Sequence, residues 1–391
     1  MQLLLSHGLA TLEHDQCALG QLFYRQDLTN DDRHIIWHAV KDNLNLFLQD
    51  GYGVAYLCTH SHLKRRQKIA ILLYALDHLS QLMQNGYQLA LLLNLPFIKK
   101  GDASNVFFQL QFQLHRLIQN SIDWYHLLSC QKLSDAQRDY IFHLKIDQVH
   151  LLLRNGRELN QLLRLPSLTP MQIAMIWRRI RPHFSKIIGD GSTLSELLES
   201  PILNFDQKFD VWINAKYRLD DIIHNGAELA SLLMNSFLRP QNKLLVWEKV
   251  KHNLANLLKT GRDLTTLLRY REFNQAQLDQ IFTVLDGHLE RLISDGYKLR
   301  NLFERLQYYS QRSTWAWKRL EKKLSTIICS HKEFIYIAKS TVFSPHQMQC
   351  IMQACASKDR HRFFHNIPEE YTAPYKTWEA NQQGDFRRLT H

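Results

Sequence analysis

The sequence predicts an all-α fold, an α-solenoid of about nine to ten repeats of 35 residues, each a long helix followed by a short helix. Three observations predict it. Glycine recurs at 35-residue intervals, and apolar residues hold fixed places relative to those glycines. Glycine and proline are also scarce, at 14 and 9 of 391 residues, which argues against a loop-rich β architecture. One unit cannot bury its apolar face alone, so stacked units must share a continuous core.

The repeat is marked by one position that returns every 35 residues, which we call the grid position. No insertion interrupts the spacing between residues 51 and 331, and a weaker match extends it upstream to residue 16. The grid positions are Gln16, Gly51, Gly86, Ser121, Gly156, Gly191, Gly226, Gly261, Gly296 and His331.

Three apolar columns keep the same register through nine units, which an accidental spacing would not do. The column fourteen residues before the grid position holds Trp37, Leu72, Phe107, Phe142, Trp177, Trp212, Trp247, Phe282 and Trp317. The column seven before it holds Leu44, Leu79, Leu114, Val149, Phe184, Leu219, Leu254, Leu289 and Leu324. The column six after it holds Leu57, Leu92, Leu127, Leu162, Leu197, Leu232, Leu267, Leu302 and Ile337.

The long helix is expected to span about 20 residues, roughly 30 Å. Its start resembles a capping box, in which a Ser, Thr or Asn precedes a Gln by three residues. Proline at the first helical position, where a missing N–H costs nothing, supports the same starts. The helix is expected to end at an Asn-Gly or Asp-Gly pair whose glycine is left-handed. A helix of about 8 residues then follows, with an acid in its first turn. The predicted boxes are Ser134–Gln137, Thr169–Gln172, Asn204–Gln207, Asn274–Gln277 and Ser344–Gln347, and the prolines are Pro170, Pro240 and Pro345.

These elements divide the chain into a solenoid over residues 1–366, capped at both ends, and a tail over residues 367–391. The first residues lack the basic region of a signal peptide, and no apolar run is long enough to span a bilayer. The six cysteines form no CxxC pair, which favours reduced thiols. We therefore expect a cytoplasmic type of protein.

Catalytic and metal-binding motifs are weak. Cys58, His60 and His62 lie close together, but Cys58 falls in an apolar column and no fourth zinc ligand is evident. The pairs His34/His38 and His361/His365 lack the glutamate of a metalloprotease helix. No phosphate-binding glycine loop or nucleophile elbow occurs. We expect no enzyme, no catalytic residue, no metal, no cofactor and no small-molecule substrate.

The basic residues are more informative. The formal charge is +11, from 48 Lys and Arg against 37 Asp and Glu, which favours an anionic partner. Cations recur on the middle segment of the long helices in the C-terminal half, and we call this set the basic ridge. It reads either as a solvated helix face or as a docking stripe for phosphates or acidic side chains. Its members are Arg178, Arg179, Arg181, Lys216, Arg218, Lys249, Lys251, Lys318, Arg319, Lys322 and Lys323.

The leucine pattern of Gln172 to Leu198, repeated in Gln207 to Leu233, resembles αα-repeat segments of effectors that bacteria secrete through a Dot/Icm-type IV system. The resemblance implies delivery into the cytosol of a host cell. The main hypothesis is thus a non-enzymatic interaction scaffold for an acidic protein partner. The alternative is an RNA-binding helical-repeat protein, because the 35-residue length resembles that of pentatricopeptide repeats. Two features differ from those repeats. The two helices of a unit are unequal in length, and the column eight before the grid position holds bulky polar residues instead of small ones. An anionic membrane is a further alternative partner.

Overall fold

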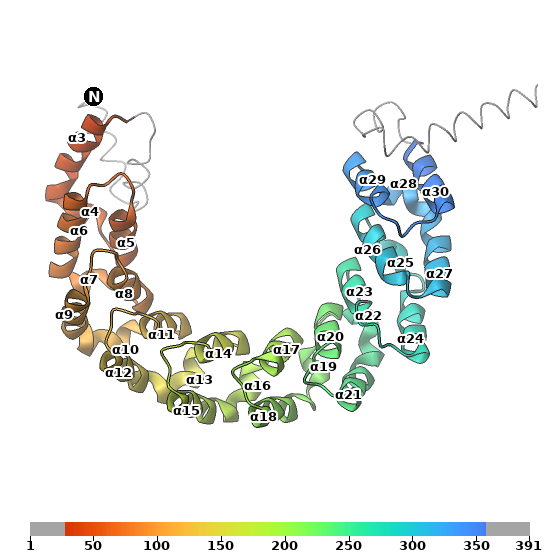
Figure 1. Ribbon diagram of the computed structural model, residues 1–391, viewed down its shortest axis with the longest axis horizontal. Helices are drawn as coiled ribbons and strands as arrows, with labels where there is room; N and C mark the ends of the chain where they lie inside the picture. The colour runs from red at the N-terminus through yellow and green to blue at the C-terminus, as the bar shows by residue number, and fades with distance from the viewer. Residues whose placement is uncertain (1–27, 357–391) are drawn as a thin grey trace, which may run out of the picture. The chain divides into compact units, whose positions relative to one another are not determined.

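The computed structural model describes residues 28–356, and every regular element in that range is helical (Figure 1). Each repeat contains a long helix, a four-residue helix and a short helix, in that order. The long helices are α3 Asn30–Val40, α6 Arg65–Asp77, α9 Lys100–Leu110, α12 Asp135–Lys145, α15 Pro170–Ile180, α18 Phe205–Ala215, α21 Pro240–Val250, α24 Gln275–Leu285, α27 Ser310–Leu320 and α30 Pro345–Ala356.

The two smaller helices of each repeat complete the unit. The four-residue helices are α4 Leu44–Phe47, α7 Leu79–Leu82, α10 Leu114–Leu117, α13 Val149–Leu152, α16 Phe184–Ile187, α19 Leu219–Ile222, α22 Leu254–Leu257, α25 Leu289–Leu292 and α28 Leu324–Ile327. The short helices are α5 Gly51–Thr59, α8 Gly86–Leu93, α11 Ser121–Leu128, α14 Gly156–Leu163, α17 Gly191–Glu199, α20 Gly226–Leu233, α23 Gly261–Leu267, α26 Gly296–Leu306 and α29 His331–Ala338. The predicted all-α repeat solenoid is therefore confirmed.

The chain divides into two compact units, residues 1–187 and residues 188–391. Within each unit the short helices lie side by side along one side, and the long helices form the other side (Figure 1). Successive short helices pack on one another, so their outward positions form one surface in each unit. We call this surface the short-helix face.

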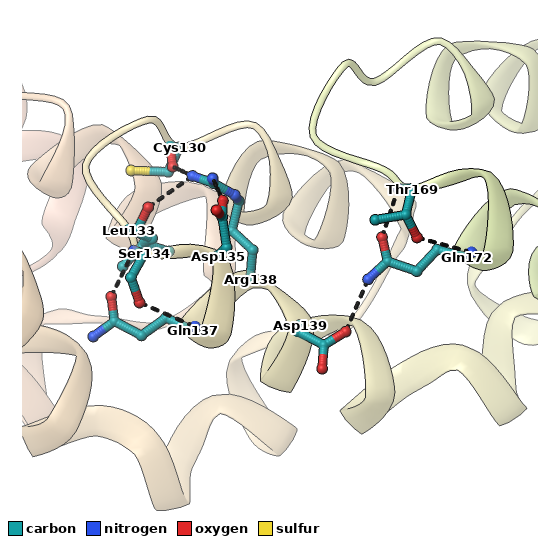
Figure 2. Close-up of polar contacts among 9 residues, drawn as sticks. All are labelled: Cys130, Leu133, Ser134, Asp135, Gln137, Arg138, Asp139, Thr169 and Gln172. Carbon is teal, nitrogen blue, oxygen red and sulfur yellow. Dashed lines mark hydrogen bonds and ion pairs between the residues drawn. The ribbon is translucent and has the colours of Figure 1, made fainter.

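The starts of the long helices follow the predicted capping boxes. The Ser134 hydroxyl accepts from the backbone N–H of Gln137 at 3.2 Å, and the Gln137 side-chain oxygen accepts from the N–H of Ser134 at 2.9 Å (Figure 2). Thr169 and Gln172 repeat this exchange, and the Gln172 amide also donates to Asp139 at 3.0 Å. The cap of one long helix thus binds the long helix before it. The other predicted boxes are also present, at Asn204–Gln207, Asn274–Gln277 and Ser344–Gln347.

The predicted long helix of about 20 residues is wrong, because the structure breaks it in two. The helix ends after 11 residues in α12, and the 3-10 turn Ile146–Gln148 leads into the four-residue helix α13. In the repeat that ends at α26 the break instead contains Gly287, with a φ of 88°. Apolar residues continue at gaps of three and four across the break, so the helical period does not reveal it.

The role predicted for the grid glycine is also wrong. Among the described residues, the glycine with a positive φ is Gly287, which does not lie at a grid position. Instead the residue before the grid position caps the short helix, as when Asn85 accepts from the N–H of Gln88 at 2.9 Å. The grid glycine is the first residue of that helix and faces the next repeat. A Cβ on Gly86 would lie 2.9 Å from the Cβ of Asp123, so close packing between short helices requires glycine there.

The three predicted apolar columns form the core. All members of the columns seven before and six after the grid position are buried. In the column fourteen before, the aromatic residues are buried and Leu72 is partly exposed. Trp124 shows how a neighbouring position completes the core, since its ring is buried and its indole N–H donates to the carbonyl of Ile141 at 3.1 Å.

Several predictions fall outside the described residues, including the grid position at Gln16, the N-terminal cap and the tail over residues 367–391. The predicted C-terminal capping helix corresponds to α30, which packs on α28. Over residues 28–356, no helix has the length and hydropathy of a bilayer span.

Candidate nucleic-acid interface

Each short helix turns the same positions toward solvent. The residues one, five and eight after the grid position point outward, because they are neighbours on one face of a helix. In α5 these include Tyr52 and Tyr56, which are 42% and 37% exposed, whereas Val54 and Leu57 behind them are buried. The outward positions are free to vary without disturbing the core, so they decide what the short-helix face can bind.

In the first unit these positions carry a run of rings, one from each of three successive repeats. The ring centroids of Tyr52 and Tyr87 lie 5.7 Å apart, and those of Tyr87 and His126 lie 4.5 Å apart. We call these three residues the aromatic ladder. Tyr125 adds a ring edge-on to His126 at 5.3 Å. Rings at these separations make favourable aromatic contacts with one another.

The close packing of α8 and α11 makes the ladder possible. The Asp123 carboxylate accepts from the backbone N–H of Tyr87 at 3.0 Å and from that of Gln119 at 3.1 Å, so it joins the two repeats. Gly86 allows this approach because it has no side chain. Burial lowers the pKa of His126, with Asp123 opposing the shift, and this favours the neutral imidazole. The ladder is therefore an uncharged aromatic surface at neutral pH.

Two hollows adjoin the ladder. A cavity of about 480 Å³ lies between α5 and α8, with Tyr52 and Tyr56 on one side and Leu91 and Pro96 on the other. A second cavity of about 240 Å³ is lined by α11 and α14 and has a more polar wall. It includes Tyr125, His126, the Glu158 carboxylate and Gln161. The first unit thus combines flat rings with concave surface beside them.

In the second unit the face changes in chemistry toward its C-terminal repeats. The Arg300 guanidinium lies 4.2 Å from the centroid of the Tyr336 ring, and the Tyr297 ring lies 4.9 Å from the same ring. Arg300 is held there by Glu304, at 2.7 Å, and by the carbonyl of Tyr336, at 2.7 Å. Arg262 on α23, Arg269 just after it and Lys332 on α29 are exposed. Together with the partly exposed Arg300 we call them the cationic end.

The structure places the basic ridge away from this face, on the long helices and the turns that follow them. Three members lie in the first unit, Arg178, Arg179 and Arg181, and the other members lie in the second. Every member is exposed or partly exposed. Several are ion-paired with nearby acids: Arg179 with Asp147 at 2.6 Å, Lys323 with Glu290 at 3.8 Å, Arg319 with Asp286, and Lys251 with Glu248.

The weak metal and catalytic motifs gain no support from the geometry. Cys58 is buried, and burial raises the pKa of its thiol to about 12, so it packs as a core residue. The rings of His34 and His38 lie 4.5 Å apart without a third ligand group at hand. Across the part of the chain that the structure describes, no group of three His, Cys, Asp or Glu residues is arranged to hold a metal ion. His361 and His365 lie outside that part.

Comparison with solved structures gives a structural likeness. No family model and no curated protein matches the chain. A solved structure of a Puf4 mutant bound to the recognition sequence of the Cox17 RNA 3′ UTR matches with 15% sequence identity and a TM-score of 0.42. The match covers 72% of this chain and 92% of that chain.

This comparison corrects two interpretations of the sequence. The resemblance to type IV secreted effectors is corrected: no family model and no curated protein bears it out, and the solved structure that matches is of a Puf4 mutant. The main hypothesis of a scaffold for an acidic protein partner is corrected as well, since none of the comparisons supports it. Sequence reasoning also missed the aromatic ladder. The signal was present as Tyr52 and Tyr87 at the same repeat position, with His126 one turn further along its helix.

Proposed function

We propose that this chain is a non-enzymatic RNA-binding repeat protein that binds single-stranded RNA on its short-helix face. The observation that carries the proposal is the aromatic ladder of Tyr52, Tyr87 and His126. Unpaired bases stack on tyrosine and histidine rings whatever their sequence, because every base has a π face. Bases inside a duplex do not expose that face.

Charge supports the same partner. The chain carries a formal charge of +11, and an RNA backbone offers a phosphate for every nucleotide. The cationic end places guanidinium and ammonium groups on α23, α26 and α29 and just after α23. The Arg300 guanidinium on the Tyr336 ring forms a planar pair on which a base can stack, while its charge is balanced by Glu304.

The basic ridge stays a second proposed contact surface for RNA phosphates. Its ion pairs to neighbouring acids weaken the positive field that a phosphate would meet. We therefore rank it second to the short-helix face as an RNA-binding surface. The two surfaces lie on different helices and can be tested separately.

The test is binding of a fluorescently labelled pool of random 20-nucleotide single-stranded RNAs, with duplex RNA and single-stranded DNA of that length for comparison. Tyr52→Ala and Tyr87→Ala should each weaken single-stranded RNA binding by about 1–3 kcal/mol, or roughly 5- to 150-fold, because each removes a stacking ring. Tyr74→Ala is the matched control, since Tyr74 stacks on His78 at 4.3 Å on the long helix α6.

Different outcomes separate the two surfaces. If ladder variants that keep the wild-type circular dichroism bind RNA as tightly as the wild type, the short-helix face is not the RNA surface. If charge reversal at Arg178 and Lys249 abolishes binding in the same assay, the basic ridge is that surface instead. If the wild type retains no RNA at all, the proposed function is wrong.

A further inference from the structure

Two hollows of the first unit meet at Pro96, shortly after the end of α8. One is the cavity of about 480 Å³ beside the ladder, with Tyr52 and Tyr56 in its wall, and we call it the ring cavity. The other has a volume of about 360 Å³, and we call it the basic cavity. Pro96 lines both cavities, so they adjoin. The residues that line the basic cavity are Leu63, Arg65, Lys68, Pro96 and Phe97.

The ring cavity has the size and walls of a site for a flat aromatic group. Its volume lies in the range of about 300–1,000 Å³ that small-ligand sites occupy, and its walls are mostly apolar and aromatic. The Asn94 side chain adds a polar group: its oxygen accepts from the Cys130 thiol at 3.5 Å, and its N–H₂ group remains a donor. The Thr59 hydroxyl instead donates to the carbonyls of Ala55 and Tyr56. A nucleobase offers both a flat ring and acceptor atoms.

The basic cavity presents two cations to one hollow. Arg65 and Lys68 are three residues apart on α6, so they lie on one face of that helix. Within residues 28–356, neither side chain forms an ion pair with a carboxylate. Between Asp50 and Asp102 the sequence holds six Lys and Arg residues and one acid, Asp77. Asp50 and Asp102 themselves cap α5 and α9. Paired guanidinium and ammonium groups of this kind bind phosphate.

We propose that the two cavities together form a site for one nucleotide of the RNA, with its base in the ring cavity and its phosphate on Arg65 and Lys68. A sugar joins the base of a nucleotide to its phosphate, so adjoining hollows of these two kinds suit one nucleotide. Tyr52 belongs to the ladder and to the ring cavity, so the site continues the ladder at one end. Every residue of the site lies in the first unit. The inference rests on the proposed function, because it names the part of the RNA that this end of the face binds.

The test is binding of the labelled pool of random 20-nucleotide single-stranded RNAs over a series of salt concentrations, with circular dichroism to check that each variant is folded. Tyr56→Ala should weaken binding roughly 5- to 150-fold, because it removes a ring from the wall of the ring cavity. Arg65→Gln together with Lys68→Gln should weaken binding and lower the slope of log affinity against log salt by about 0.7, the value for one phosphate of a single strand.

Combining the Tyr56 and cation variants should weaken binding by less than the product of their separate effects, because either change already releases the same nucleotide. Arg66→Gln is the matched control, since Arg66 is an exposed neighbour of Arg65 that lines neither cavity. It should keep the wild-type affinity and slope.

Several results would overturn the nucleotide site while leaving the proposed function in place. One is wild-type RNA binding in the Tyr56 variant or in the cation variant. Another is separate effects that multiply in full, since the two cavities would then hold different nucleotides. A loss in Arg66→Gln equal to that in the cation variant would show a general effect of charge. Adenosine 5′-monophosphate alone should bind more weakly than the RNA, and equal affinity would assign the site to a free nucleotide. Failure of the wild type to bind any RNA would instead refute the proposed function.

Discussion

Replacing Gly226 by alanine should destabilise the protein, although alanine is the better helix former. Gly226 begins α20, and an added Cβ would lie 2.8 Å from the Asp263 carbonyl oxygen and 3.0 Å from its carbonyl carbon. Those atoms are backbone, so they cannot rotate away. Alanine should gain about 0.4–1 kcal/mol by restricting the unfolded chain. Overpacking should cost about 1–3 kcal/mol, so the net loss should be of order 1 kcal/mol.

The assay is urea unfolding followed by tryptophan fluorescence, with Gly101→Ala as the matched control. Gly101 lies in the long helix α9, and a Cβ there would meet nothing within 4 Å. That variant should be stabilised by about 0.5–1 kcal/mol, as expected for glycine to alanine in a helix. If Gly226→Ala raised the unfolding midpoint as Gly101→Ala does, close packing would not be the reason for the grid glycine.

Four further outcomes are expected. Ser134→Ala should lower stability by about 1 kcal/mol in urea, because it removes a helix cap, and an unchanged midpoint would contradict the capping box. Trp124→Ala should cost about 3–5 kcal/mol by the same measurement, because the ring is fully buried, and a loss below 1 kcal/mol would argue against that burial. Burial lowers the pKa of His126 below its ordinary value of 6.5, so the unfolded chain binds the proton more readily. The free energy of unfolding should therefore be full above about pH 6.5 and fall as the pH drops toward the folded pKa. Between pH 7.5 and 5, His126→Gln should lose less of that free energy than the wild type does. An equal loss in both proteins would mean that another group causes the pH dependence. Tyr87→Ala should weaken RNA binding without changing its salt dependence, because the ring carries no charge, and a lower slope in a salt titration would contradict stacking.

The repeat and its core could be predicted because they depend on periodicity. Residues such as Leu57 and Leu92 recur at one interval, and the recurring burial of that column follows from stacking like units. Capping boxes such as Ser134 with Gln137 are equally local, since three residues separate the partners. Both kinds of signal lie within a single repeat.

The features that could not be predicted depend on distances between elements. The break after α12 leaves the apolar spacing intact, so the pattern reads as one long helix. The role of Gly86 depends on how closely Asp123 of the next repeat approaches it. The aromatic ladder depends on the same approach, because Tyr87 and His126 are far apart in sequence and meet only when α8 and α11 pack.

The most direct test of the account is ultraviolet crosslinking of the full chain to single-stranded RNA, followed by mass spectrometry of the crosslinked peptides. The short-helix face predicts crosslinks in the peptides that contain Tyr52, Tyr87 and Tyr125, and in those that contain Tyr297 and Tyr336. Crosslinks confined to the long helices, such as α15 and α21, would contradict it.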